Sequence, residues 1–309
     1  MKTLQELLGV EYPIIQGGMA NIATHKLAAA VSEAGGLGLI GAGGWDVDKV
    51  RFEIREARKV TDKVVGVNIM LMSPHAAAIS DMVIEEGIKV ITTGAGNPGI
   101  YMEKWKAAGI IVIPVVPSVA LAKRMERSGA DALVVEGTEA GGHIGELTTF
   151  TLLPQVRDAV DLPIIAAGGV ADYRGLDAAF CLGAQGVQIG TVLLASEECP
   201  IHINYKNSVV KAKDTSTVVT GRGTGAPVRV LKNKMSRRYL ELTKEGNIDL
   251  HELEKLTLGS LRKAVLEGDM DGGSIMAGQS AGLVKSVRPV KEILDDMYVK
   301  SKVYRGILA

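Results

Sequence analysis

The chain has 309 residues, and its 35 lysine and arginine side chains balance 35 aspartate and glutamate side chains, so the formal net charge is zero. This balance gives no general attraction for nucleic acid or for an anionic membrane, and we expect neither as a partner. Two cysteines without a CxxC pair are too few for a disulfide framework and favour a reducing compartment. The longest apolar run, 109–122, is too short to span a bilayer, and the N-terminus carries charges where a signal peptide needs apolar residues. We therefore expect a cytoplasmic protein.

Eight short runs rich in β-branched residues recur at roughly 25-residue intervals. They begin near Tyr12, Leu37, Val64, Val90, Ile110, Ala132, Pro163 and Gly186. Each run is almost entirely apolar, which is typical of strands buried on both faces of a parallel sheet. Amphipathic stretches between them begin at Thr, Asp or Ser and end at Gly, as helices do. The pattern predicts an α/β fold, a (β/α)₈ TIM barrel; an open doubly wound sheet is the alternative.

The alternation of strands and helices stops near residue 196. Segment 197–268, here called the insert, is polar, basic in its middle and free of runs that resemble barrel strands. Glycines and a final amphipathic helix return after it. We predict that 1–196 and 269–309 form the barrel and that 197–268 forms a small lid domain inserted after the eighth strand.

Two glycine-rich motifs resemble nucleotide-binding loops but stand in the wrong context. Residues 36–41 match G-x-G-x-x-G, yet a helix is expected before the match and the match itself lies on a predicted strand, whereas the dinucleotide motif follows a strand and opens a helix. Residues 221–225 lack the Lys-Ser/Thr ending of a phosphate-binding P-loop. We interpret the first as a strand and the second as a turn of the insert.

The carboxyl ends of the strands are where TIM barrels place their active sites. The residues at these predicted ends are mostly glycines and amides with few charges: Gly18, Met19, Asn68, Glu136, Gly141, Ala167, Gly168, Gly169, Gln188, Gly190 and Thr191. This composition suits a large flat ligand contacted by the backbone better than it suits a metal, and no His, Cys, Asp or Glu spacing indicates a metal site.

The ends of the seventh and eighth strands are the part of a barrel that often binds phosphate through backbone N–H groups. Ala167, Gly168 and Gly169 end one strand, and Gln188 to Thr191 end the next. Glycines allow phosphate oxygens to approach the backbone, and Thr191 adds a hydroxyl. The alternative is that the glycines only turn each strand into the following helix.

The segment VEGTEAGGHIG, 135–145, places His143 after two glycines and near Glu136 and Glu139. An imidazole titrates near physiological pH, so His143 is a candidate acid, base or hydrogen-bond donor at the rim. An ordinary loop histidine is the alternative interpretation.

These motifs resemble the FMN-dependent enoyl-acyl carrier protein reductase II family of the FabK type, within the wider group that includes nitronate monooxygenases, formerly 2-nitropropane dioxygenases. The resemblance covers almost the whole chain and is carried by YPIIQGGMA, AGGLGLIG, GVNIMLMSP, TTGAGNP, VEGTEAGGHIG, IAAGG, QIGT and DGGSIMAGQSAGLV. The segments NIMLMSP and IPVVPSVALAKRMERSGADALVVEGTEAGGHIGELTT favour the reductase branch.

The resemblance implies FMN across the strand ends and NADH or NADPH as the reductant. It implies that Gly168, Gly169, Gly190 and Thr191 hold the phosphate and that His143 is the catalytic group on the substrate side. The other implied cofactor-binding residues surround the flavin ring and ribityl chain, line the same cleft or return from the tail as a cover: Gly18, Met19, Asn68, Glu136, Gly141, Ala167, Gln188, Met276, Gly278 and Gln279.

The resemblance also implies a partner, an acyl carrier protein that presents a trans-2-enoyl thioester during fatty acid synthesis. Because that carrier is acidic, basic side chains of the insert are candidate docking charges: Lys211, Lys213, Lys232, Lys234, Arg237 and Arg238. A merely solvated lid is the alternative. A homodimer is also expected from the resemblance.

Two other hypotheses stay open at this point. In a nitronate monooxygenase, His143 would be the base that acts on a nitroalkane, and the reduced flavin would meet oxygen in the same fold and FMN site. A flavin-binding barrel without enzymatic activity is less favoured, because it has little use for His143 on a glycine loop.

Overall fold

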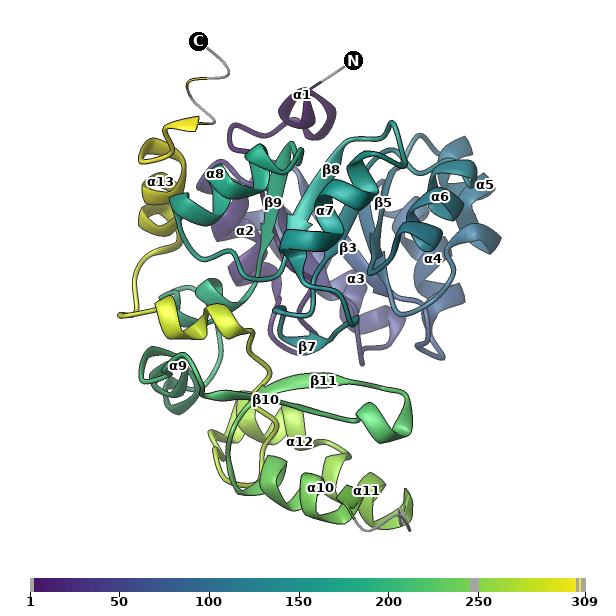
Figure 1. Cartoon of the computed structure of the whole chain (residues 1–309). Coiled ribbons are helices and arrows are strands. Elements are labelled where there is room, and N and C mark those ends of the chain that lie inside the picture. Colours follow the sequence, from purple (N-terminus) through teal and green to yellow (C-terminus); the bar gives the residue numbers. More distant parts are fainter. Residues whose placement is uncertain (1–2, 245–249, 304–305, 307–309) are drawn as a thin grey trace.

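The computed structural model describes residues 3–244, 250–303 and 306 (Figure 1). Eight parallel strands form one sheet in the order β1-β9-β8-β6-β5-β4-β3-β2. They are β1 (Ile14–Gln16), β2 (Gly38–Gly41), β3 (Val65–Met70), β4 (Val90–Gly94), β5 (Ile111–Val116), β6 (Leu133–Glu136), β8 (Ile164–Ala167) and β9 (Gly186–Ile189). Each of the eight predicted runs contains one of these strands.

The two edges of this sheet meet between β1 and β2. The Gln16 N–H donates to the Leu37 carbonyl at 2.9 Å, and the Leu37 N–H donates to the Ile14 carbonyl at 2.9 Å. The sheet therefore closes on itself, which confirms the predicted TIM barrel and excludes the open doubly wound sheet. The G-x-G-x-x-G match ends on β2, directly after a helix, so its interpretation as a strand is also confirmed.

Eight helices of the described residues surround the barrel. They are α2 (His25–Glu33), α3 (Val47–Val60), α4 (Ala76–Glu85), α5 (Gly99–Ala107), α6 (Val119–Arg127), α7 (Thr149–Arg157), α8 (Tyr173–Cys181) and α13 (Val290–Val299). Side chains of Thr24, Asp46, Ser118 and Asp172 accept hydrogen bonds from first-turn N–H groups, which is why the helices begin where they do. The final helix, α13, packs between α8 and α2 and so completes the ring.

The amino-terminal end of the barrel is closed by α1 (Leu4–Leu8). Leu4 and Leu8 are buried in the same apolar cluster as the barrel-interior side chains Ile15, Ile113 and Ile165. Figure 1 shows α1 at one end of the barrel and the insert at the other. The open end of the barrel is therefore the carboxyl end of its strands, on the side of the insert.

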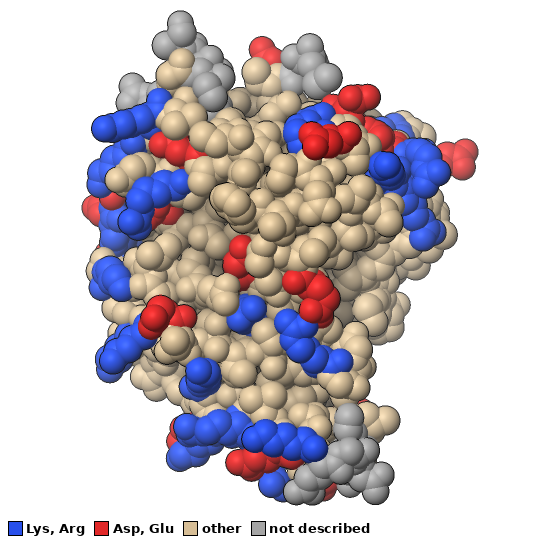
Figure 2. Space-filling view, in the orientation of Figure 1, with Lys and Arg blue, Asp and Glu red and all other residues tan. Residues whose placement is uncertain are grey.

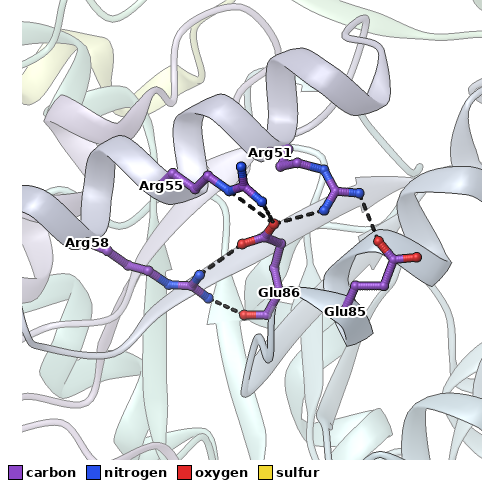
Figure 3. A network of polar contacts seen from close by, with 5 residues as sticks. All are labelled: Arg51, Arg55, Arg58, Glu85 and Glu86. Carbon is purple, nitrogen blue, oxygen red and sulfur yellow. Dashed lines mark hydrogen bonds and ion pairs between the residues drawn. The ribbon is translucent and has the colours of Figure 1, made fainter.

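A cluster of charged side chains joins α3 to the end of α4 (Figure 3). Arg51, Arg55 and Arg58 place guanidinium nitrogens 2.9, 2.8 and 2.9 Å from the Glu86 carboxylate. Burial alone would raise the pKa of Glu86, but hydrogen bonds from Arg55 and Arg51 outweigh it and hold the pKa below its ordinary value. Because α4 ends toward the amino-terminal face, this cluster stabilises the outer ring and lies away from the strand ends where barrels place their chemistry.

The insert contains α9 (Ile203–Val210), β10 (Thr217–Thr220), β11 (Val228–Leu231), α10 (Lys234–Lys244), α11 (Leu250–Thr257) and α12 (Ser260–Arg262). None of its described strands belongs to the barrel. Instead β10 and β11 form a three-stranded antiparallel sheet with β7 (Gly142–His143), which comes from the loop after β6. The insert is thus joined to the barrel through the segment that carries His143. Its action as a lid stays a prediction.

Across residues 3–244, 250–303 and 306, no helix combines the length and the apolar character that crossing a membrane requires.

Candidate active site

A cavity of about 490 Å³ lies at the carboxyl ends of the barrel strands. Thirteen of the fifteen residues predicted for the site line it: Gly18, Met19, Asn68, Glu136, Gly141, His143, Ala167, Gly168, Gly169, Gln188, Gly190, Thr191 and Met276. Residues from 225 to 227, at the tip of the β10–β11 hairpin, and Leu261 of α12 line the opposite wall. The cavity therefore lies between the barrel and the insert.

The other two predicted residues, Gly278 and Gln279, do not line the cavity. The Gly278 N–H donates to Thr191 Oγ1 at 2.9 Å, and the Gln279 N–H donates to the Glu139 carbonyl at 2.9 Å. The Gln279 side chain is exposed. These two residues hold the tail against the outer side of the cavity wall. The sequence did not show that they lie behind the wall and do not face the cavity.

Gly18 and Gly168 are glycines for two different physical reasons. A Cβ on Gly18 would lie 2.1 Å from the Asn68 Cγ, far inside any permitted contact. Gly168 has φ +91°, which side-chain-bearing residues rarely adopt, and its Cβ would lie 2.9 Å from the Gly137 carbonyl oxygen. Both residues let chain segments approach one another closely at the floor of the cavity.

The floor of the cavity also offers unpaired polar groups. The N–H groups of Gly168, Gly169 and Gly190 have no acceptor in the part of the chain that the structure describes. The Gln188 Oε1 is buried and likewise lacks a donor there. Buried polar groups are normally satisfied, so this set of donors and one acceptor fits a polar ligand that carries an anionic group. The glycines do turn the chain, as the alternative interpretation held, but they also leave these groups free.

The Asn68 amide is oriented by a contact that the sequence did not indicate. Thr92, on β4, is the register partner of Asn68 on β3, and its hydroxyl donates to Asn68 Oδ1 at 2.8 Å. The Asn68 Nδ2 is therefore the atom left to donate to a ligand. Only the pairing of two strands reveals this contact.

His143 stands on a loop that the insert holds in place. In the β7–β11 ladder, His143 lies opposite Val228 and Gly142 lies opposite Arg229. The imidazole lines the cavity and makes no hydrogen bond with any described residue. His143 keeps an exposed face, but the cavity wall partly desolvates its imidazole and lowers its pKa below the ordinary value, so the neutral form predominates at pH 7. A neutral imidazole can donate from one nitrogen and accept at the other.

Glu139, which lies near His143 in sequence, has a different partner. Its carboxylate accepts two hydrogen bonds from the Thr149 N–H, at 3.0 and 2.9 Å, at the start of α7. The Thr149 Oγ1 also lies 3.1 Å from the Ala167 carbonyl and 3.0 Å from the Gly168 carbonyl. Glu139 and Thr149 therefore brace the loop after β6 against the end of β8, and neither lines the cavity.

Met276 is held over the cavity from the insert side. The Tyr205 hydroxyl donates to the Met276 carbonyl at 2.8 Å, and Met276 forms a β-bridge with Val230 of β11. The same strand, β11, thus positions both Met276 and His143. The predicted turn at 221–225 forms the tip of this hairpin, with Gly221 and Gly225 in the left-handed region at φ 79° and 78°.

Glu136 ends β6 and faces the cavity without a charged partner among the described residues. Burial raises the pKa of its carboxyl to about 8 from a value of 4.5, so the group is mainly protonated at pH 7. As the pH rises from about 4.5 to about 8, the unfolded chain loses this proton and the folded chain keeps it, so the free energy of unfolding falls.

The variant Glu136→Gln should therefore remove a pH-dependent loss of stability. We expect its Tm to exceed that of the unmodified protein by at least about 2–4 °C at pH 9. At pH 5 the two proteins should differ much less. Thermal unfolding followed by circular dichroism at both pH values measures this. A difference in Tm that is the same at pH 5 and pH 9 would show that the carboxyl is not protonated in the fold.

Among the described residues, no group of three or more His, Cys, Asp or Glu side chains is placed to hold a metal ion. The remaining lining residues that the sequence did not indicate are mostly apolar: Ile22, Met72, Val115, Pro117, Ile144, Val170, Leu194, Pro227 and Leu261. They come from many loops, and only the closure of the barrel brings them together.

The barrel with a cavity at its strand ends and the family matches together define the class of protein, a flavin-dependent TIM-barrel oxidoreductase. Residues 1–299 match the family model described as nitronate monooxygenase, and the chain belongs to this family. The FabK-type resemblance that the sequence motifs predicted within this family is confirmed by the comparisons that follow.

Three similar proteins carry different names. The solved structure of FabK from Thermotoga maritima superimposes with a TM-score of 0.95 and 48% identity, covering 100% of this chain and 97% of that chain. A probable nitronate monooxygenase of Staphylococcus saprophyticus is 35% identical, covering 90% of this chain and 92% of that protein. A (3aS,4S,5R,7aS)-5-hydroxy-7a-methyl-1-oxo-octahydro-1H-indene-4-carboxyl-CoA dehydrogenase of Mycobacterium tuberculosis is 32% identical, covering 95% and 94%.

Proposed function

We propose that this protein is an FMN-dependent enoyl-acyl carrier protein reductase, which reduces trans-2-enoyl thioesters with NADH or NADPH in fatty acid synthesis. One observation carries the proposal: the His143 imidazole, which has no hydrogen-bond partner among the described residues, lies in a cavity whose side-chain walls are largely apolar, among them Met70, Met72 and Leu261. An acyl thioester has both a carbonyl for the imidazole and a chain for the apolar wall. A small nitronate would leave that wall in contact with water. The 48% identity with FabK supports the same choice.

The residues of the cavity fit FMN. The free N–H groups of Gly168, Gly169 and Gly190 and the Thr191 hydroxyl would hold the phosphate, since Thr191 Oγ1 accepts from Gly278 and keeps its own proton to donate. The flavin ring and the ribityl chain would be contacted by seven other lining residues: Gly18, Met19, Asn68, Glu136, Gly141, Ala167 and Gln188. Met276 would cover the cofactor. When bound, FMN would supply hydride transfer between the nicotinamide and the thioester.

His143 would act on the substrate side. Its neutral imidazole would donate a hydrogen bond to the thioester carbonyl oxygen, where negative charge develops as hydride reaches the β-carbon. Alternatively it would support the delivery of a proton to the α-carbon. Over the whole reaction, NAD(P)H and one proton are consumed and a saturated thioester and NAD(P)⁺ are formed. The apolar wall would exclude water while the protein orients the carbonyl.

An acyl carrier protein is the proposed partner, and the insert is the proposed docking surface. The insert carries thirteen lysine and arginine residues against nine aspartate and glutamate residues. In Figure 2, basic side chains gather over the lower part of the molecule, where α10 lies. Of the six predicted docking charges, Lys234 pairs with Asp271 at 2.6 Å and Arg238 lies 3.8 Å from Glu241. Docking would therefore fall mainly to the other four: Lys211, Lys213, Lys232 and Arg237. The proposal includes a cytoplasmic location and a homodimer.

Nitronate monooxygenase activity is the second candidate, favoured by the family model and by the Staphylococcus saprophyticus relative. In that case His143 would be the base that removes a proton from a nitroalkane, and the cofactor site would be the same. The two functions differ in their co-substrates: the reductase consumes NAD(P)H, and the monooxygenase consumes oxygen.

One pair of assays tests the proposal against this alternative. Purified protein loaded with FMN is mixed with NADH or NADPH and a crotonyl thioester, and separately with a nitronate under air. Loss of NAD(P)H that depends on the thioester supports the reductase. Oxygen uptake with the nitronate, independent of nucleotide, supports the alternative and overturns the proposal. A barrel that only binds flavin would show neither.

A further inference from the structure

Arg229 is a buried arginine on β11 that the proposed reaction does not use. Its exposed fraction is 6%, and it does not line the cavity. No carboxylate of the described residues lies within ion-pair distance of it. Burial, reinforced by the charge of Arg222, lowers its pKa, and the charge of Glu139 opposes this only from a distance. A buried guanidinium without an ion pair is costly to retain, so its contacts need an explanation.

The contacts of Arg229 join the insert to the loop of His143. Its Nε donates to the Thr138 carbonyl at 2.9 Å, and its Nη1 donates to Thr217 Oγ1, on β10, at 3.1 Å. The backbone of Arg229 lies opposite Gly142 in the β7–β11 ladder. A single residue of the insert therefore contacts the loop after β6 at two places, on either side of Gly141.

Glu139 and Thr149 brace one part of the loop, whereas the segment directly before His143 consists of glycines, which restrain the backbone least. Gly141 and Gly142 directly precede His143, and Gly142 has φ +79°. The imidazole makes no side-chain hydrogen bond with any residue that the structure describes, so its position depends strongly on the loop backbone that carries it. At the amino-terminal side of the glycines, the Thr138 carbonyl is held by Arg229.

We propose that Arg229 is a positioning residue for His143: by holding the Thr138 carbonyl, it keeps the loop after β6 in the conformation that directs the imidazole at the substrate. The catalytic part of this inference rests on the proposed enoyl reductase function, whereas the effect on the loop does not. A purely structural role in the hairpin would instead depend on the Thr217 bond.

Three variants separate these roles. Arg229→Met keeps the length of the side chain and removes both hydrogen bonds, while Arg229→Lys can restore one donor to the Thr138 carbonyl. Thr217→Val, the matched control, removes only the bond on the hairpin side. Each variant is studied as the FMN-loaded protein by hydrogen–deuterium exchange over 137–145, by bound flavin, and by kcat and KM with a crotonyl thioester.

We expect the amide hydrogens of 141–144 to exchange at least about tenfold faster in Arg229→Met than in the unmodified enzyme. We also expect its kcat to fall by about 10- to 100-fold. Its KM, its flavin content and its rate of flavin reduction by NAD(P)H should stay close to those of the unmodified enzyme. Arg229→Lys should recover part of kcat, and Thr217→Val should resemble the unmodified enzyme in both measurements. If Arg229→Met does not fold, the comparison of Arg229→Lys with Thr217→Val carries the same test.

Unchanged exchange over 137–145 in folded Arg229→Met overturns the positioning role whatever the substrate is. Faster exchange with an unchanged kcat overturns the link to catalysis. If the unmodified protein reduces no enoyl thioester but Arg229→Met still exchanges faster, the proposed function is rejected. The role of Arg229 in holding the loop is then still supported.

Discussion

Replacing His143 with alanine is expected to lower kcat/KM for enoyl thioester reduction by about 100- to 1,000-fold, the loss that follows removal of one donor to a developing oxyanion. The imidazole lines the cavity and has no structural partner among the described residues, so its removal should cost little stability. FMN content and the rate of flavin reduction by NAD(P)H should stay near those of the unmodified enzyme, because no proposed flavin contact is lost. Steady-state kinetics, visible absorbance and anaerobic rapid mixing measure these quantities.

His75 provides the matched control for this substitution. It is an exposed histidine at the start of α4, its side chain makes no capping hydrogen bond, and it does not line the cavity. His75→Ala should leave all three quantities unchanged. If His143→Ala turned over enoyl thioester as fast as His75→Ala, His143 would have no part in the mechanism.

Gly18→Ala is expected to abolish tight FMN binding. The new Cβ would lie 2.1 Å from the Asn68 Cγ and 2.3 Å from the Asn68 Cβ, so the whole Asn68 side chain would have to move. Asn68 is held by the Thr92 hydroxyl at 2.8 Å, and moving it breaks that bond and turns the Nδ2 donor away from the cavity. An overpacked contact of this kind costs about 1–3 kcal/mol, equivalent to roughly a 5- to 150-fold weaker affinity before the lost donor is counted.

The neighbouring glycine, Gly17, separates this clash from a general effect of adding a methyl group. A Cβ on Gly17 would meet the Ile189 carbonyl oxygen at 3.5 Å, an ordinary contact, and Gly17 has no positive φ. Quenching of FMN fluorescence should give a Kd for Gly17→Ala within about threefold of the unmodified protein. Equal FMN affinity in Gly18→Ala and Gly17→Ala would reject the proposed contact between Asn68 and the flavin.

Most of the candidate site could be predicted because it depends on local sequence. Glycines at the ends of buried strands, such as Gly168 and Gly190, mark the rim of a barrel before any contact is known. Gly278 and Gln279 show the limit of such patterns, since these residues, two and three positions after Met276, fasten the tail behind the wall instead of lining it. A sequence pattern indicates a segment near a site but not which of its atoms face the ligand.

The contacts around His143 could not be predicted in the same way. Glu139 is four residues from His143 yet binds Thr149, whereas Val228 is 85 residues away and pairs with His143 directly. Likewise Thr92 orients Asn68 across two strands. Contacts between residues far apart in the chain leave no periodicity in the sequence, because they depend on how separate elements pack.

The amino-acid sequence by itself determined the barrel, its eight strands and the glycine rim at their ends, because buried parallel strands and helix ends impose short-range patterns on a chain. The tertiary structure alone decided that the hairpin of 197–268 adds β7 to its sheet and so holds His143 and Met276 over one cavity. Strands pair through backbone N–H and C=O groups, which almost all residues have in common. Which strand pairs with which therefore depends on how the elements pack, and the side-chain pattern of the sequence does not reveal it.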